Sequence, residues 1–139
     1  MPTSKSHAGR IILGIDPGFA DMGYGVIRDG ENQAAYLTCG TVATKKGRPF
    51  AERLLQLAEG LEALIKKYSP DLVAVEKLFF SKNIKTAIDV AQARGVAIVL
   101  AAQHGVTVTE YTPLEVKQSL TSYGLATKTQ VAHMVKTLL

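Results

Sequence analysis

The order of apolar and polar positions along the chain predicts five strands. Residues 11–15 form a short, nearly continuous apolar run, which is typical of a strand covered on both faces and therefore central in its sheet. Glycines and polar residues then separate strands at 24–28 and 35–44, and the short turns between these strands indicate an antiparallel meander. Apolar runs at 72–75 and 106–111 predict two further strands.

Two long helices are expected between these strands. From residue 49 to residue 68 the apolar positions recur at steps of three and four, which predicts an amphipathic helix. A second helix is expected at about 83–103, and capping patterns at Thr112 and Thr127 predict two shorter helices. Because a strand–helix–strand crossover joins parallel strands, 72–75 should run parallel to an earlier strand. The pattern therefore predicts an α/β fold with a mixed sheet flanked by helices.

Length, composition and charge indicate how many domains the chain forms, where it is found and what kind of partner it binds. The chain has 139 residues, of which 47% are apolar, and this suits one domain, predicted at 10–139 after a loose polar tail at 1–9. Cys39 is the single cysteine and cannot form an internal disulfide, and no long apolar run opens the chain, so we expect a cytoplasmic protein. The 16 basic and 12 acidic residues give a net charge of +4, which favours a polyanionic partner where the basic residues cluster.

Two acidic residues stand at the ends of predicted parallel strands. Asp16 ends the first apolar run, and Glu76 directly follows 72–75. Ligands of open α/β sheets gather at the carboxyl ends of the strands, and paired carboxylates there suit Mg²⁺. We therefore expect Asp16 and Glu76 to be catalytic metal ligands, holding two Mg²⁺ ions for the cleavage of a phosphodiester. The alternative is that each acid merely ends a strand in solvent.

Glycines surround the first acid. Gly14 and Gly18 flank it, and Gly23 and Gly25 follow, which predicts a turn where backbone could approach a phosphate. A similar arrangement occurs in ATPases of the actin and sugar-kinase class, so a nucleotide-phosphate enzyme stays open as an alternative.

The segment after the second acid combines aromatic and basic residues. Phe79 and Phe80 lie between Lys77 and Lys82. An exposed aromatic ring beside lysine can stack on unpaired bases while the lysine neutralises phosphates, so Phe79 and Lys82 are predicted to bind DNA. The alternative is that one or both rings are buried in the core.

The long middle helix is apolar on more than one side. One stripe is formed by Ile84, Ile88, Ala91, Gly95 and Ile98, and much of the opposite side is apolar too. One domain cannot easily cover both sides, and small residues permit close helix approach, so this stripe is predicted to form a homodimer interface. The alternative is a helix buried within one subunit.

Six separated segments resemble the RuvC family of Holliday-junction resolvases. In chain order they are residues 14–18, 23–27, 75–83, 92–97, 116–118 and 133–139. The resemblance implies an RNase H-like fold, a homodimer, and symmetric nicking of two opposing strands of a four-way junction with Mg²⁺ or Mn²⁺ during recombination and repair. It also implies RuvA–RuvB as the partner branch-migration complex.

Residue roles follow from the same resemblance by matching position. It implies that Asp16 and Glu76 are metal ligands, that Phe79 inserts at the crossover, and that Lys117 and Lys128 contact DNA near the cleaved phosphate. Glu110 stands at a strand end but matches no metal ligand of the family. His133 is expected to serve packing or to face solvent.

The sequence departs from the family at its end. In the family the last helix leads into a segment whose paired acids complete the metal site, whereas this sequence stops at Leu139. We therefore expect a C-terminally truncated domain. A junction-binding protein with impaired cleavage is the alternative to a fully active nuclease.

Overall fold

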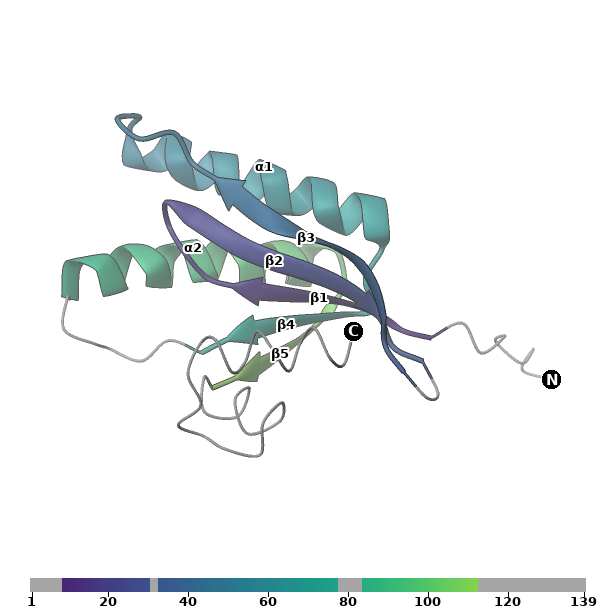
Figure 1. The fold of residues 1–139 in the computed structure, drawn as a ribbon. Coiled ribbons are helices and arrows are strands. Elements are labelled where there is room, and N and C mark those ends of the chain that lie inside the picture. The colour runs from purple at the N-terminus through teal and green to yellow at the C-terminus, as the bar shows by residue number, and fades with distance from the viewer. Residues whose placement is uncertain (1–8, 31–32, 78–83, 113–139) are drawn as a thin grey trace.

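The computed structural model describes residues 9–30, 33–77 and 84–112 of the chain (Figure 1). These residues form a five-stranded sheet and two helices. In chain order the elements are β1 (Ile11–Asp16), β2 (Asp21–Arg28), β3 (Ala35–Ala43), α1 (Phe50–Tyr68), β4 (Leu72–Glu76), α2 (Ile84–Gln103) and β5 (Thr107–Tyr111). Of the predicted tail, only Gly9 lies within the described residues. The two short helices predicted from Thr112 onward lie outside them.

The sheet is mixed, with strand order β3-β2-β1-β4-β5. The pairs β1–β2 and β2–β3 are antiparallel, whereas β1–β4 and β4–β5 are parallel. The predicted meander, the central first strand and the parallel fourth strand are all confirmed. β2 begins at Asp21 rather than at residue 24, because Asp21 and Met22 already pair with Ala43 and Val42 of β3.

Both helices cover the same face of the sheet (Figure 1). Between the layers, Leu13, Val26, Val73 and Val75 of the strands are at most 1% exposed. From the helices, the buried core side chains are Leu57, Leu61, Ile65, Ala93, Ala97, Leu100 and Ala101. Removal of this apolar surface from water is the main force that holds helices and sheet together.

The ends of α1 follow from local chemistry. Pro49 occupies the N-cap position, where its missing N–H costs nothing, and Lys66 and Lys67 in the last turn suit the negative end of the helix dipole. Ser69 takes a left-handed conformation with φ of 45°, and its backbone N–H donates to the carbonyl of Ile65 at 2.9 Å. The predicted end of this helix at residue 68 is confirmed.

The topology brings several connections to one edge of the sheet. Since β2 alone runs against β1, the carboxyl ends of β1, β3, β4 and β5 share that edge. Lys77, which follows β4, lies at the same edge beside Tyr111. Side chains at these four strand ends can therefore meet around a common site.

Candidate active site at the carboxyl edge of the sheet

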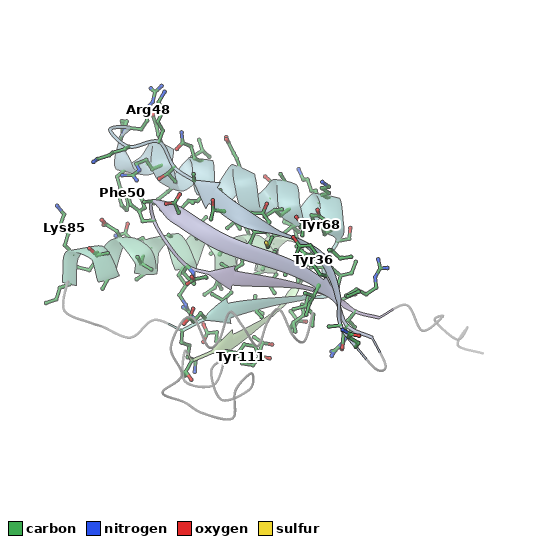
Figure 2. All side chains as sticks on the ribbon, in the orientation of Figure 1. Tyr36, Arg48, Phe50, Tyr68, Lys85 and Tyr111 are labelled. Carbon is green, nitrogen blue, oxygen red and sulfur yellow. The ribbon has the colours of Figure 1, made fainter. Side chains whose placement is uncertain are left out.

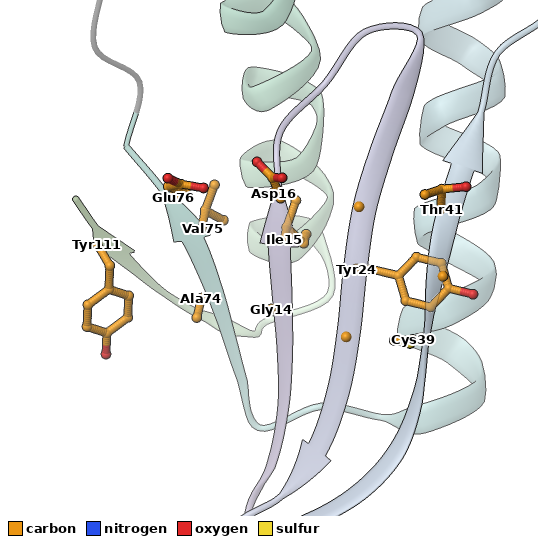
Figure 3. Close-up of a pocket in the computed structure, with 13 residues that line it drawn as sticks. Gly14, Ile15, Asp16, Tyr24, Cys39, Thr41, Ala74, Val75, Glu76 and Tyr111 are labelled. Atoms are coloured by element: carbon orange, nitrogen blue, oxygen red, sulfur yellow. The ribbon is translucent and has the colours of Figure 1, made fainter. Parts of the chain in front are cut away.

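The two predicted acids lie side by side. Asp16 is the last residue of β1 and Glu76 the last residue of β4. The parallel register pairs Ile15 with Val75, so the next residue on each strand is one of the acids. Figure 3 shows both carboxylates at the ends of these neighbouring strands. Adjacent strands are about 4.8 Å apart, which is a separation that one or two cations can bridge.

A hollow of about 710 Å³ adjoins the two acids. Its lining comes from four strands near the site and from the end of β5: Gly14, Ile15, Asp16, Gly23, Tyr24, Gly25, Cys39, Gly40, Thr41, Ala74, Val75, Glu76 and Tyr111 (Figure 3). Gly14 pairs with Gly25 on one side and with Ala74 on the other, so a row of residues with little or no side chain crosses the sheet. This row leaves room for a ligand to approach the backbone closely.

The glycines of β2 differ from the prediction. Gly23 was expected in a turn that could approach a phosphate, and Gly25 lay within the strand predicted at 24–28, but both are strand residues paired with β1 and β3. The expectation was wrong because the cross-strand hydrogen bonds continue through the glycines and back to Asp21. The turn itself is confined to residues 17–20.

Gly23 keeps the surface beside Asp16 open. A Cβ at Gly23 would lie 3.4 Å from the Cβ of Asp16 and 3.9 Å from its Oδ2. On the far side of Gly23, the register places Thr41 of β3, which also lines the hollow (Figure 3). The two acids and the Thr41 hydroxyl thus form a polar rim that is interrupted only by a glycine.

A basic loop lies at the same edge. Lys45, Lys46 and Arg48 are exposed between β3 and α1, and Lys85 is exposed in the first turn of α2. Figure 2 labels Arg48 and Lys85. Because these basic residues lie in a loop or at a helix start, the sequence suggests a DNA-facing surface here, and this stays a prediction. Positive charge here would offset the repulsion between a polyanion and the two acids.

The base of this loop is firmly anchored. The Thr44 hydroxyl donates to the carbonyl of Phe19 at 3.0 Å and accepts a bond from Arg53 Nε at 2.9 Å. The Arg53 guanidinium also lies 4.2 Å from the centre of the Phe19 ring, and that ring stacks on Phe50 at 4.8 Å. The loop is therefore tied both to the turn that follows Asp16 and to α1.

One other polar contact concerns Cys39, which lines the hollow. The Tyr36 hydroxyl donates to Cys39 Sγ at 3.5 Å. This hydrogen bond to Cys39, followed by partial desolvation, raises the pKa of Tyr36 above its usual 10.0.

An arginine of α2 contacts the ends of β4 and β5. Arg94 Nε donates to the carbonyl oxygen of Glu76 at 3.3 Å, and the guanidinium forms an ion pair with Glu110. Glu110, which the sequence left without a role, is thus the partner of Arg94. Arg94 had no predicted role, although it lies in segment 92–97, one of those that resemble the family.

Metal-ligand clusters are sparse in this part of the protein. Within the described residues, no group of three or more His, Cys, Asp or Glu side chains could hold a metal ion. Within those residues, Asp16 and Glu76 are thus a pair and not part of a larger cluster of such side chains. The predicted DNA-binding residues Phe79, Lys82, Lys117 and Lys128, like His133, lie outside the described ranges.

The predicted interface residues form an uncovered stripe on α2. Ile84 is 69% exposed and Ile88 47%, and Val99 on the same side is 56% exposed. Ala91 is also exposed, while Gly95 and Ile98 are partly exposed. A Cβ at Gly95 would meet nothing within 4 Å. The opposite side of α2 carries the buried core residues, so the helix is apolar on more than one side, as predicted.

The fold and the edge geometry define an RNase H-like domain with paired acids at the carboxyl ends of β1 and β4. A family model described as "Crossover junction endodeoxyribonuclease RuvC" matches residues 12–139. The chain belongs to the RuvC family.

Individual relatives agree with this assignment. The chain is 50% identical to the RuvC of Ruminiclostridium cellulolyticum, over 93% of this chain and 78% of that protein. It is 51% identical to the RuvC of Rubrobacter xylanophilus, over 96% of this chain and 75% of that protein. The structure of Thermus thermophilus RuvC in complex with a Holliday-junction substrate matches with a TM-score of 0.87 and 35% identity, over 94% of this chain and 79% of the other.

Neither α1 nor α2, the helices of the described ranges, is long and apolar enough to cross a bilayer.

Proposed function

We propose that this chain resolves Holliday junctions by nicking two opposing strands, with Asp16 and Glu76 holding the metal ions at each site. Its family consists of crossover junction endodeoxyribonucleases, which are phosphodiester hydrolases. The observation that carries the residue assignment is the parallel β1–β4 register, which puts the two carboxylates next to each other beside an open hollow.

The donor set fits a hard cation. The family is metal-dependent, and carboxylate oxygens are the ligands that Mg²⁺ and Mn²⁺ take. When bound, two such ions would activate a water and neutralise charge on the scissile phosphate. Asp16 and Glu76 would hold these ions through their carboxylate oxygens. Further ligands would come from the phosphate, from water, or from residues outside the described ranges.

The surroundings of the acids suit a DNA backbone. The glycines and Ala74 leave the sheet surface flat, and the exposed Lys45, Lys46 and Arg48 stand at the same edge. In this arrangement the DNA strand lies across the hollow, and Lys45 and Lys46 of the loop neutralise the phosphates on either side of the cleaved one. Phe79, Lys82, Lys117 and Lys128 remain predicted DNA contacts.

The α2 stripe supports a homodimer. Its exposed isoleucines and the open surface at Gly95 suit the approach of a second copy of the same helix. An isologous contact of this kind gives two sites related by a two-fold axis, which matches a four-way junction with two opposing strands to cut. The RuvA–RuvB complex as partner and a cytoplasmic location remain proposals that rest on the family.

A labelled four-way junction tests the proposal. We expect symmetric nicks in the presence of Mg²⁺, and we expect Asp16→Asn and Glu76→Gln to lower the cleavage rate by at least about 100-fold, since a removed charge-stabilising group typically costs 10²–10³. Junction binding in EDTA should change little. Glu59→Gln, at an exposed carboxylate of α1, is the matched control and should cut normally.

Three outcomes would separate the alternatives. Junction binding without nicks by the wild-type chain would support a binding protein with impaired cleavage. Equal loss of binding and cutting in Asp16→Asn would contradict a metal role. Tight ATP binding with no preference for junctions would support the nucleotide-phosphate enzyme.

A further inference from the structure

The Arg94 side chain joins three elements behind the active site. It extends from the middle of α2 and is 19% exposed. One of its nitrogens donates to the main-chain carbonyl of Glu76 at 3.3 Å, and another pairs with the carboxylate of Glu110. A single guanidinium therefore links α2 to the last residue of β4 and to the penultimate residue of β5.

Arg94 reaches β4 from the side of the helices. Val75 is fully buried beneath α1 and α2, and the parallel register pairs it with Glu110, so these two residues share that face. Side chains alternate along a strand, and hence Glu76 presents its carboxylate to the opposite face. Arg94 thus holds the backbone of Glu76 from the helix side, and the Glu76 side chain lines the hollow.

The same strand end is held by β5. The amide of Lys77 donates to the carbonyl of Tyr111 at 2.6 Å, which continues the β4–β5 pairing past Glu76. Arg94 and Tyr111 thus fix Glu76 at the point where regular pairing ends.

We propose that Arg94 is a positioning residue that sets the place of the Glu76 carboxylate for metal binding. The inference rests on the proposed role of Glu76 as a ligand. Mg²⁺ demands near-ideal octahedral geometry, so a ligand on a loose strand end would bind it poorly. Groups that orient metal ligands commonly contribute 10–100-fold to metal affinity.

The planar fork of arginine is essential to this role. A guanidinium offers donors in a rigid geometry and can hold two acceptors at once, whereas a lysine ammonium is a point charge on a flexible stem. Arg94→Lys therefore keeps a partner for Glu110 and loses the simultaneous bond to Glu76. Glu110→Gln keeps the bond from Nε and removes the ion pair.

Three measurements on the purified chain test the inference. Calorimetric titration with Mn²⁺ gives the metal affinity, hydrogen exchange of the Lys77 amide in EDTA reports the strand end without metal, and thermal melting reports the fold. We expect Arg94→Gln and Arg94→Lys to weaken Mn²⁺ binding 10–100-fold and to speed Lys77 exchange, with junction binding in EDTA unchanged. Glu110→Gln should have a smaller effect than either. Where Arg94→Gln does not fold, Arg94→Lys carries the test.

Controls separate this inference from the proposed function. Arg10→Gln breaks an exposed ion pair with Asp29 at the opposite edge of the sheet and should change neither Mn²⁺ affinity nor Lys77 exchange. If Glu76→Gln loses Mn²⁺ binding while Arg94→Lys keeps the wild-type Mn²⁺ affinity and Lys77 exchange rate, the positioning role of Arg94 is overturned and the ligand role of Glu76 stands. Wild-type Mn²⁺ affinity in Glu76→Gln would overturn the ligand role and the inference with it.

Discussion

The contact between Gly60 of α1 and Val42 of β3 gives a quantitative test of the packing. A Cβ at Gly60 would lie 2.5 Å from Val42 Cγ1 and 3.2 Å from Cγ2. Carbon atoms in contact normally lie about 3.5–4.0 Å apart, so Gly60→Ala would force a shift of about 1 Å. Val42 is β-branched and stiff at χ1, which makes a simple rotation away from the helix costly.

Two opposing effects determine the result of Gly60→Ala. Overpacking of this size costs about 1–3 kcal/mol, while replacing glycine by alanine within a helix gains about 1 kcal/mol. We therefore expect the variant to lose up to about 2 kcal/mol of unfolding free energy. In a Val42→Ala background both γ-carbons are gone, and the same Gly60→Ala change should stabilise by about 1 kcal/mol.

Urea unfolding followed by circular dichroism measures this double-mutant cycle, with all four proteins at one concentration because association would shift apparent stability. The helix-propensity gain is common to both backgrounds and cancels, which leaves an interaction energy of about 1–3 kcal/mol. An interaction energy below about 0.5 kcal/mol would refute the close packing of Gly60 on Val42, since independent sites add to within that margin.

Two further predictions concern α2 and the end of α1. Ile88→Asp should convert the proposed dimer to a monomer in sedimentation velocity, while the helical signal in circular dichroism is kept. Leu55→Asp, at a similarly exposed leucine of α1, is the control and should leave the mass of the particle unchanged. Dimers in both variants would rule out the α2 interface. Ser69→Gly should raise the free energy of unfolding by roughly 0.5–1 kcal/mol, because a left-handed conformation costs a residue with a Cβ more than it costs glycine. A drop in stability on urea unfolding would contradict that account of the C-cap.

Most of the fold could be predicted because its signals are local. Buried strands such as 11–15 and 72–75 are short apolar runs, α1 has a clear three-to-four period, and Ser69 with Pro70 marks its end. The extent of β2 could not be predicted. Glycines at 23 and 25 indicate a turn when taken alone, and only pairing with both neighbours shows that they continue the strand.

The pair of acids in the candidate site could be predicted because it depends on strand order. The contacts of Arg94 could not, because they depend on side chains that meet between distant elements. Asp16 and Glu76 follow apolar runs, so a parallel pairing of those runs is enough to bring them together. Arg94 is distant from both acids in the chain, and its contacts depend on how α2 is rotated on the sheet. The roles of Asp16 and Glu76, and those of the predicted DNA-binding residues, stay predictions.

The placement of α2 has a consequence for the spacing of cuts. Its inner side contacts the backbone of Glu76 through Arg94, and its outer side carries the proposed subunit interface. Under that pairing, the distance between the two cleavage centres is set by two rigid helices rather than by loops. A change in the crossing angle of the helices would then displace both centres together, and the two nicks would stay symmetric about the junction even as their separation changed.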